Sequence, residues 1–290
     1  MNTSDLESRC LAVGYIADEE LSTTLELMQQ LSRPLLVEGD AGVGKTAIAK
    51  VLSAVLGRPL IRLQCYEGLD ISAAVYEWNY SHQLLSIKRH ELEQSTEHGE
   101  TDIFAERFLL ERPLLKAIRT ADPCVLLIDE VDRADEAFEA FLLELLSDFQ
   151  VTIPELGTIT AKTIPLVVLT SNGTRELSDA LRRRCLYHYL DYPDADKELK
   201  ILKTHQPNVD ETLANQVVQF VQQLRREELK KPPGIAETLD WVGALMSMDI
   251  KSLVDNPTLI LSTRACLLKT REDVARLSQA AIAELLGARQ

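Results

Sequence analysis

The chain has 290 residues and carries 31 Lys and Arg against 45 Asp and Glu, for a net charge of -14 at pH 7. This shortage of basic residues argues against a large static face for DNA or RNA, because such a face needs Lys and Arg to neutralise phosphates. No apolar stretch approaches the roughly 18–20 residues that a membrane span requires. The first ten residues also lack the basic and apolar regions of a signal peptide.

The cysteines are widely spaced and include no Cys-x-x-Cys pair. They are Cys10, Cys65, Cys124, Cys185 and Cys266. An odd number without metal-ligand spacing indicates reduced structural thiols rather than a disulfide framework or a metal site. Together with the missing signal peptide, this pattern predicts a cytoplasmic protein.

Short apolar runs alternate with helical patterns over the first two thirds of the chain. The runs are residues 34–39, 59–65, 124–130 and 164–172. Runs of this length without period-2 alternation predict strands that are covered on both faces. Alternation of such strands with helices favours a parallel sheet between two helical layers. We therefore expect an α/β core over residues 1–193.

The last third of the chain has helical periodicity instead of apolar runs. Its clearest pattern is Val217, Val218, Val221 and Leu224, and a break follows at residues 231–234. This predicts a small all-helical domain over residues 194–290. The acidic excess lies almost entirely before it, because residues 1–193 hold 31 acidic and 18 basic residues. The most polar stretch, residues 91–102, is expected to be an exposed loop or helix end.

The most specific motif follows the first predicted strand and precedes a predicted helix over residues 46–57. It fits the pattern G-x-x-x-x-G-K-[ST] and consists of Gly39, Asp40, Ala41, Gly42, Val43, Gly44, Lys45 and Thr46. Glycines let successive N–H groups turn inward, and the helix adds its dipole, so the loop forms a nest for phosphate oxygens. Lys45 is predicted to reach the β- and γ-phosphates of ATP, and the Thr46 hydroxyl to bind Mg²⁺. A chance glycine-rich turn is the alternative, and the strand–loop–helix context argues against it.

A pair of carboxylates, Asp129 and Glu130, ends the third predicted strand. Ligands of α/β sheets bind at the carboxyl ends of the strands, which is where this pair is expected. Asp129 is predicted to hold Mg²⁺, and Glu130 to act as general base for the attacking water. An apolar strand followed by Asp-Glu is common by itself, and the upstream phosphate loop is what makes the catalytic interpretation preferable.

Polar residues also follow the fourth predicted strand. Asn172 is predicted to hydrogen-bond the γ-phosphate and the lytic water, with a turn-forming Ser-Asn-Gly as the alternative. Arg182, Arg183 and Arg184 come next. One of them, Arg184 by preference and Arg183 next, is predicted to reach the γ-phosphate of a neighbouring subunit, and at least one is expected to be a surface or salt-bridge residue.

These elements, in this order, resemble the AAA+ ATPases, whose fold is an αβα sandwich followed by a small helical lid. Residues 129–153 are similar to the MoxR branch, with its pattern D-E-x-N-R-A before a helix and Q-V-T-I, although Asp132 stands where that branch has Asn. Residues 61–70, 76–80 and 231–241 look like the CoxD-like accessory ATPases of carbon-monoxide dehydrogenase.

The resemblance implies a hexameric ring that hydrolyses ATP with Mg²⁺ at its subunit interfaces. It also implies a partner with a von Willebrand factor A domain and a chaperone role in maturing a client metalloenzyme, such as carbon-monoxide dehydrogenase or a related molybdenum hydroxylase. The family has inserts where residues 76–104 and 150–163 lie, and these are expected to contact the client. For Tyr76, Trp78 and Tyr80, simple packing is an equal alternative.

Two features of the helical part bear on the resemblance. Related MoxR proteins carry a lid arginine in a Ser-Pro-Arg-Ala context, whereas residues 233–237 read Pro-Gly-Ile-Ala-Glu here. Arg264 is a possible substitute that comes late in the lid. Glu237 and Trp241 lie four residues apart and are expected to pack within the lid.

An acidic segment offers a possible assembly surface, because residues 129–148 hold eight acidic residues and one basic residue. In a ring it would meet the arginine cluster of the next subunit. Two other functions stay open: a nucleotide-gated scaffold with little hydrolysis, and a nucleic-acid-directed AAA+ motor, which the negative charge disfavours.

Overall fold

The computed structural model describes residues 3–92, 102–254 and 257–286. Contacts divide the chain into two compact units. The first, called the sheet unit, comprises residues 20–38 and 46–188. The second, called the helical unit, comprises residues 1–19, 39–45 and 189–290. The domain boundary between residues 193 and 194 stays a prediction.

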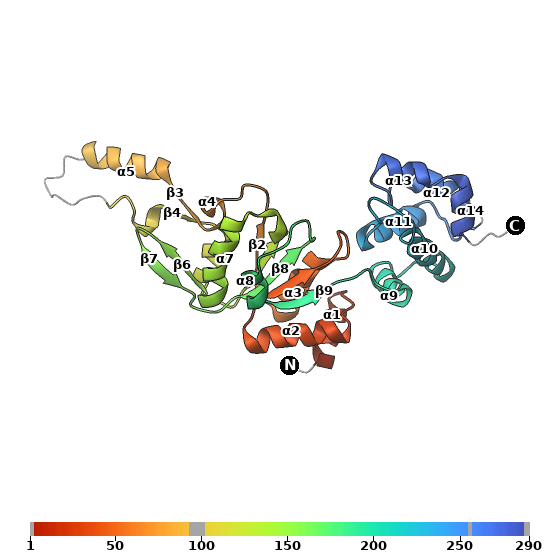
Figure 1. Ribbon diagram of the computed structural model, residues 1–290, viewed down its shortest axis with the longest axis horizontal. Helices are drawn as coiled ribbons and strands as arrows, with labels where there is room; N and C mark the ends of the chain where they lie inside the picture. Colours follow the sequence, from red (N-terminus) through yellow and green to blue (C-terminus); the bar gives the residue numbers. More distant parts are fainter. Residues whose placement is uncertain (1–2, 93–101, 255–256, 287–290) are drawn as a thin grey trace. The chain divides into compact units, whose positions relative to one another are not determined.

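A five-stranded sheet runs through the described part of the core (Figure 1). Its order is β2-β5-β8-β1-β9. The strands are β1 (Leu35–Glu38), β2 (Leu60–Gln64), β5 (Val125–Asp129), β8 (Leu166–Ser171) and β9 (Leu186–Tyr189). β2 pairs with β5, β5 with β8 and β8 with β1, each time in parallel. Each of the four apolar runs contains one of these strands, so the expectation of an α/β sandwich is confirmed. The prediction that all four are covered on both faces is wrong for β2, an edge strand in which Arg62 and Gln64 are exposed.

Helices surround this sheet. Those that the structure describes in or next to the sheet unit are α2 (Glu19–Leu31), α3 (Lys45–Leu56), α4 (Ile71–Ala74), α5 (Tyr80–Leu92), α6 (Pro113–Arg119), α7 (Glu136–Asp148) and α8 (Asp179–Arg184), with the short 3₁₀ helices η1 (Glu106–Phe108) and η2 (Val131–Arg133). α7 begins after Asp135, whose carboxylate accepts a 2.8 Å hydrogen bond from the Phe138 N–H. This is the usual N-cap arrangement, in which a side chain satisfies a free N–H of the first turn.

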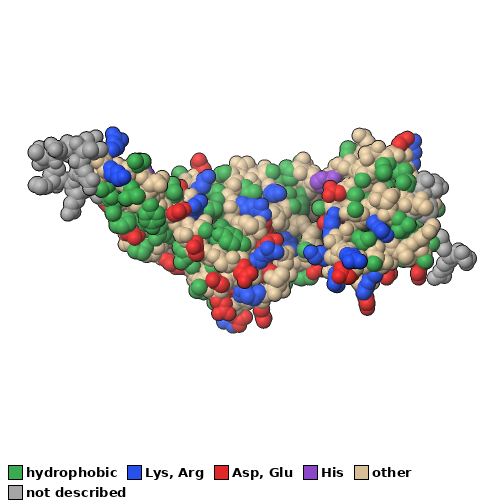
Figure 2. Space-filling model, turned by 90° about the horizontal axis from the view of Figure 1, so that it is seen from above, with side chains coloured by type: hydrophobic (Ala, Val, Ile, Leu, Met, Phe, Trp, Pro, Cys, Tyr) green, Lys and Arg blue, Asp and Glu red, His purple; other side chains and the backbone are tan. Residues whose placement is uncertain are grey.

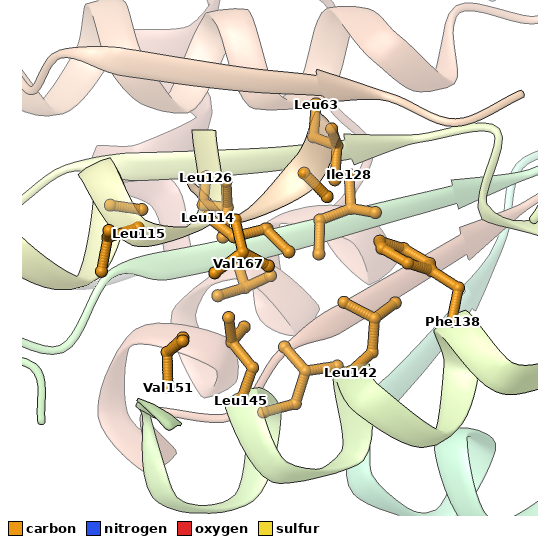
Figure 3. Close-up of a cluster of buried hydrophobic side chains, with 14 of the residues drawn as sticks. Leu63, Leu114, Leu115, Leu126, Ile128, Phe138, Leu142, Leu145, Val151 and Val167 are labelled. Atoms are coloured by element: carbon orange, nitrogen blue, oxygen red, sulfur yellow. The ribbon is translucent and has the colours of Figure 1, made fainter. Parts of the chain in front are cut away.

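The core lies between the sheet and α7 (Figure 3). Every residue of β5 is buried. On one face, Leu126 and Ile128 of β5 and Val167 of β8 point toward a row of apolar side chains on α7, labelled Phe138, Leu142 and Leu145 in Figure 3. Close packing on both faces holds the carboxyl ends of β5 and β8 rigidly, so the polar residues at those ends have defined positions.

Two antiparallel two-stranded sheets involve the expected inserts. One pairs β3 (Tyr76–Trp78) with β4 (Leu109–Glu111), and the other pairs β6 (Gln150–Ile153) with β7 (Gly157–Thr160). β4 follows the predicted insert 76–104 instead of lying within it. The Trp78 side chain is buried and makes edge-on ring contacts with Tyr76 and Phe104. Trp78 is thus a packing residue, whereas Tyr80 is 63% exposed. Residues 93–101 of the acidic stretch lie outside the described residues.

The helical unit has a core of its own. The described helices are α1 (Thr3–Ala12), α9 (Ala195–His205), α10 (Glu211–Leu224), α11 (Ile235–Ser247), α12 (Pro257–Thr263), α13 (Arg271–Arg276) and α14 (Gln279–Leu285). The periodic residues of α10 are buried, as predicted. Trp241 is fully buried and donates its indole N–H to the Thr263 hydroxyl at 2.9 Å, which confirms its packing role. Across the ranges that the structure describes, no helix is long and apolar enough to cross a membrane.

Candidate nucleotide site

Residues 39–44 form the loop that joins β1 to α3. Gly42 and Gly44 have φ angles of +86° and +100°, in the left-handed region that side chains disfavour. A Cβ on Gly44 would meet open space, so the backbone angle rather than crowding requires glycine there. Positive φ angles at these positions are compatible with a concave row of N–H groups, and the twelve-residue helix α3 begins directly after it. The loop therefore fits a phosphate chain.

Lys45 is the first residue of α3, and its side chain is buried. Its ammonium donates 2.7 Å hydrogen bonds to the carbonyl oxygens of Gly39 and Asp40. These contacts hold the positive charge beside the loop. An ammonium has three donors and a flexible stem, so the group can exchange carbonyl partners for phosphate oxygens.

In the sheet unit, Thr46 and Asp129 are in direct contact. The Thr46 hydroxyl donates to Asp129 Oδ1 at 3.0 Å, and the Thr170 hydroxyl donates to the same oxygen at 2.6 Å. Arg62 donates to Asp129 Oδ2 through Nε at 3.1 Å and Nη2 at 2.5 Å. The carboxylate is only 2% exposed, and these four hydrogen bonds compensate for its burial.

The Thr46–Asp129 pair has the chemistry of a magnesium site. Hydroxyl and carboxylate oxygens are ligands that Mg²⁺ prefers, and this ion usually takes one or two protein ligands together with phosphate and water oxygens. Within the described residues, no group of three or more His, Cys, Asp or Glu side chains is placed to hold a metal. The donor set thus fits a metal shared with a nucleotide better than a closed structural metal site.

Glu130 differs from its neighbour in both backbone and exposure. It has φ +54° and ψ +50°, an unusual conformation for a residue with a side chain, and its N–H donates to the Thr170 hydroxyl at 2.9 Å. Its carboxylate is one-third exposed and forms an ion pair with Arg133 at 3.0 Å. The turn at Glu130 thus separates a buried carboxylate, Asp129, from one that solvent reaches.

Asn172 follows β8 in a turn that Asp132 holds. The Asn172 N–H donates to Asp132 Oδ1 at 3.2 Å, and Thr174 donates to Oδ2 through its N–H at 2.9 Å and its hydroxyl at 2.6 Å. Burial raises the pKa of Asp132, but the hydrogen bonds from Thr174 and Asn172 outweigh it, and the net shift is downward. A carboxylate accepts all three donors, whereas an asparagine in its place would offer one acceptor oxygen.

The three arginines at residues 182–184 differ in their contacts. Arg182 pairs with Glu38 at 3.3 Å and is partly buried, so it is the salt-bridge residue expected among the three. Arg183 and Arg184 are exposed. Arg184 donates to the Ser147 hydroxyl at 2.5 Å, and the carbonyl oxygens of residues 183–185 accept hydrogen bonds from Arg33. The two predicted finger residues thus lie on the exposed side of α8.

Most of the acidic segment is engaged within the sheet unit. Six of its eight acidic residues accept hydrogen bonds or form ion pairs there: Asp129, Glu130, Asp132, Asp135, Glu139 and Glu144. The other two, Glu136 and Asp148, are exposed. Any charge complementarity between subunits would therefore depend chiefly on these two side chains.

Three polar groups at this site were missed by the sequence reasoning. Arg62 and Thr170 bind Asp129, and Asp132 holds the turn of Asn172. The alternation of apolar and polar residues in β2 could have indicated Arg62, because it places Arg62 and Gln64 on one exposed face of the strand. Arg62 also donates to Gln64 Oε1.

The thiol of Cys65 lies in the same electrostatic environment. Burial, and then the negative charges of Asp129, Asp132 and Glu130, raise the pKa of Cys65 to about 12. The thiol stays neutral at physiological pH and behaves as a small apolar side chain.

Arg264 lies within the helical unit. Its guanidinium donates to the carbonyl oxygens of Val274 at 3.4 Å and Leu277 at 3.3 Å. These contacts tie the loop after α12 to the end of α13. They give Arg264 a structural use, and its suggested role as a nucleotide contact stays a prediction.

Comparisons with known proteins assign this sequence to a family. The sequence pattern of the family described as "AAA domain (dynein-related subfamily)" matches residues 34–185. Uncharacterized proteins of Staphylococcus haemolyticus and Staphylococcus epidermidis are 26% and 27% identical over 240 residues, which is 80% of this chain and 82% of each relative.

A solved structure of a RuvB mutant from Thermotoga maritima has a similar fold. Its TM-score is 0.51 at 17% identity, and the alignment covers 99% of this chain and 83% of that one. At this identity the likeness concerns the fold alone. The family pattern, however, spans more than half of the 290 residues and includes the phosphate loop, β5 and β8. The chain therefore belongs to the dynein-related subfamily of AAA domains.

Proposed function

We propose that this chain is an ATP-hydrolysing AAA+ ATPase of the MoxR type. The observation that carries the proposal is the contact between the Thr46 hydroxyl and the buried Asp129 carboxylate, directly after the phosphate loop. Lys45 and Thr46 are consecutive residues of one G-x-x-x-x-G-K-[ST] motif, which assigns both to the same nucleotide. Bound Mg²⁺ would supply charge neutralisation for the transferring phosphoryl group.

Each residue has a role that follows from its position. The loop N–H groups and Lys45 bind the phosphates, and Thr46 with Asp129 holds the metal. Glu130, which solvent reaches, accepts a proton from the attacking water, while Asn172 orients that water. Arg184 or Arg183 of a neighbouring subunit stabilises negative charge in the transition state.

Two variants test the assignment of binding and hydrolysis. Lys45→Ala should abolish the rise in melting temperature that ATP and Mg²⁺ produce. Glu130→Gln should retain that rise but lose turnover by about 10²–10⁴-fold, the usual contribution of a general base. Glu284→Gln is the matched control, since Glu284 is an exposed glutamate on α14 and has no proposed role in binding, hydrolysis or assembly. Turnover at the control's rate in the Glu130→Gln variant would refute the role of Glu130.

The client and partners are proposed from the CoxD-like resemblance. We infer a hexameric ring that assists maturation of a metalloenzyme together with a von Willebrand factor A protein. An exposed apolar surface on α5 gives the client a contact region, because Tyr80, Leu84 and Leu85 are each about 60% exposed. Figure 2 shows hydrophobic side chains gathered at the end of the sheet unit that carries α5 and the two small antiparallel sheets.

Affinity capture with the Glu130→Gln variant tests this role. A metalloenzyme subunit or a von Willebrand factor A protein that is retained with ATP and released without it would support the proposal. Recovery of the ATPase alone would count against it. Replacing Leu84 and Leu85 with Ser in the Glu130→Gln variant should weaken capture. The same replacement in the chain with Glu130 intact should leave basal turnover unchanged.

A nucleotide-gated scaffold with little hydrolysis is the second candidate. The observation in its favour is that Arg62 occupies Asp129 Oδ2, an oxygen that the metal shell would otherwise use. Steady-state turnover separates the two functions. Turnover at the background rate of Glu130→Gln, both with and without a partner, would identify a scaffold.

A further inference from the structure

Within the helical unit, the phosphate loop rests on the N-terminus of α11. The contact is between the main chains of two glycines. A Cβ added to Gly234 would lie 2.6 Å from the Gly42 carbonyl oxygen and 2.7 Å from Gly42 Cα. The N–H of Ile235, the first residue of α11, donates to the same Gly42 oxygen at 3.1 Å. Only glycine at position 234 permits this approach.

A second contact nearby joins the loop to another segment of the same unit. The Tyr192 hydroxyl donates to the Ala41 carbonyl oxygen at 3.2 Å. The guanidinium of Arg225 lies over the Tyr192 ring in a cation–π arrangement, with Arg225 Cζ 4.8 Å from the ring centroid. Arg225 also donates to the Pro233 carbonyl oxygen at 2.8 Å. One arginine thus holds both elements that contact the loop.

Arg225 is itself fixed by a buried ion pair. Its two terminal nitrogens donate to the Glu198 carboxylate at 2.7 Å each, and both side chains are less than 10% exposed. The Thr238 hydroxyl lies 3.1 Å from a Glu198 carboxylate oxygen and 3.1 Å from the Gly234 carbonyl oxygen, and its single proton is donated to one or shared between them. The start of α11 is therefore a rigid platform rather than a fraying helix end.

The contact has a consequence for the phosphate nest. A peptide group is planar, and its C=O and N–H point in opposite directions. When Ile235 and Gly234 hold the Gly42 carbonyl oxygen, they also fix the direction of the Val43 N–H in the same peptide. The start of α11 thus sets the direction of the Val43 N–H, one of the N–H groups of the G-x-x-x-x-G-K-[ST] loop.

We propose that Gly234 is a positioning residue for the phosphate loop and that its contact with Gly42 couples bound phosphates to α11 through the main chain. This inference rests on the proposed nucleotide binding. It also accounts for the sequence of residues 233–237, which places no arginine at the start of α11. In this chain a main-chain contact links the start of α11 to the phosphate loop.

Gly234→Ala tests the contact without straining the backbone. Gly234 has φ −83° and ψ −176°, angles that alanine adopts freely, so the added methyl group acts only through its clash with Gly42. The matched control is Gly243→Ala in the same helix, where a Cβ would meet only Gln206 Nε2 at 3.7 Å. Both variants are made in the full chain, with melting temperature measured in the absence of nucleotide.

The measurements are the affinities for ATP with Mg²⁺ and for inorganic triphosphate, which has no base or sugar. We expect Gly234→Ala to weaken both about ten- to a hundredfold, the usual contribution of one hydrogen bond to a charged group. Both affinities are measured well below the melting temperatures of the two variants, because alanine is favoured over glycine inside a helix but not at an N-cap, so their stabilities should differ. Equal triphosphate affinities in the two alanine variants would overturn the proposal.

Two further outcomes are distinguishable. If the unsubstituted chain binds neither ATP nor triphosphate, the proposed function fails first. If Gly234→Ala melts early, Tyr192→Phe decides, because it removes only the hydroxyl that holds Ala41. A severalfold loss of triphosphate affinity in Tyr192→Phe supports the platform, and unchanged affinity overturns it.

Discussion

Removing Arg225 should destabilise the helical unit strongly. Arg225→Met would leave the Glu198 carboxylate, which is 1% exposed, with only Gln222 and Thr238 as side-chain donors. Breaking a buried ion pair by removing one partner costs about 3–5 kcal/mol, because a buried charge is left uncompensated. Replacing both partners by apolar residues avoids that penalty. The double variant Glu198→Leu with Arg225→Met should therefore be far more stable than the sum of the single effects predicts.

Urea unfolding followed by tryptophan fluorescence measures this. The chain has two tryptophans, and Trp241 lies in the core of the helical unit, so a Trp78→Phe background isolates its signal. Lys203→Met is the control, because it breaks an exposed pair with Glu211 and should cost no more than about 1 kcal/mol. A cost below about 1 kcal/mol for Arg225→Met, or strict additivity in the double variant, would refute the reasoning.

Three smaller predictions follow from single contacts. Asp135→Ala should destabilise the sheet unit by about 1 kcal/mol in denaturant titration, since it removes the cap on the Phe138 N–H, and Asp135→Asn should retain most of that stability. Among the five thiols, only Cys266 should react rapidly with a disulfide reagent, because burial raises the pKa of the other four, and a fast phase that persists in Cys266→Ser would contradict this. Burial raises the pKa of Asp273, but hydrogen bonds from Thr270 and two main-chain N–H groups outweigh it and lower the pKa overall. The stability that Asp273 contributes is thus full above about pH 4 and is lost as the pH falls through its folded-state pKa. Asp273→Asn should flatten the acid side of the stability profile, and an unchanged profile would count against this.

Local features of the fold were predictable because each depends on residues close in sequence. Apolar runs marked β1, β2, β5 and β8, and the glycine spacing marked the phosphate loop. The periodicity of α10 marked a buried helix face. Each signal reflects which side chains a short segment can bury, and that follows from the segment's own pattern.

The partners of the candidate residues were not predictable in this way. Arg62 reaches Asp129 because β2 lies next to β5 in a register that pairs Gln64 with Asp129. Asp132 reads as a minor substitution in the sequence, yet its carboxylate gathers three donors around Asn172. Such contacts depend on strand order and register, which long-range packing decides.

The motif at residues 39–46, the carboxylates that follow an apolar run and the net charge that disfavours nucleic acid can all be read from the residues alone. How those groups are held depends on the fold. It paired Thr46 with Asp129, separated the buried Asp129 from the more exposed Glu130, and set Gly42 against Gly234. The physical reason is that a motif specifies which atoms are available, whereas their directions are set by hydrogen bonds and contacts with residues far away in the chain.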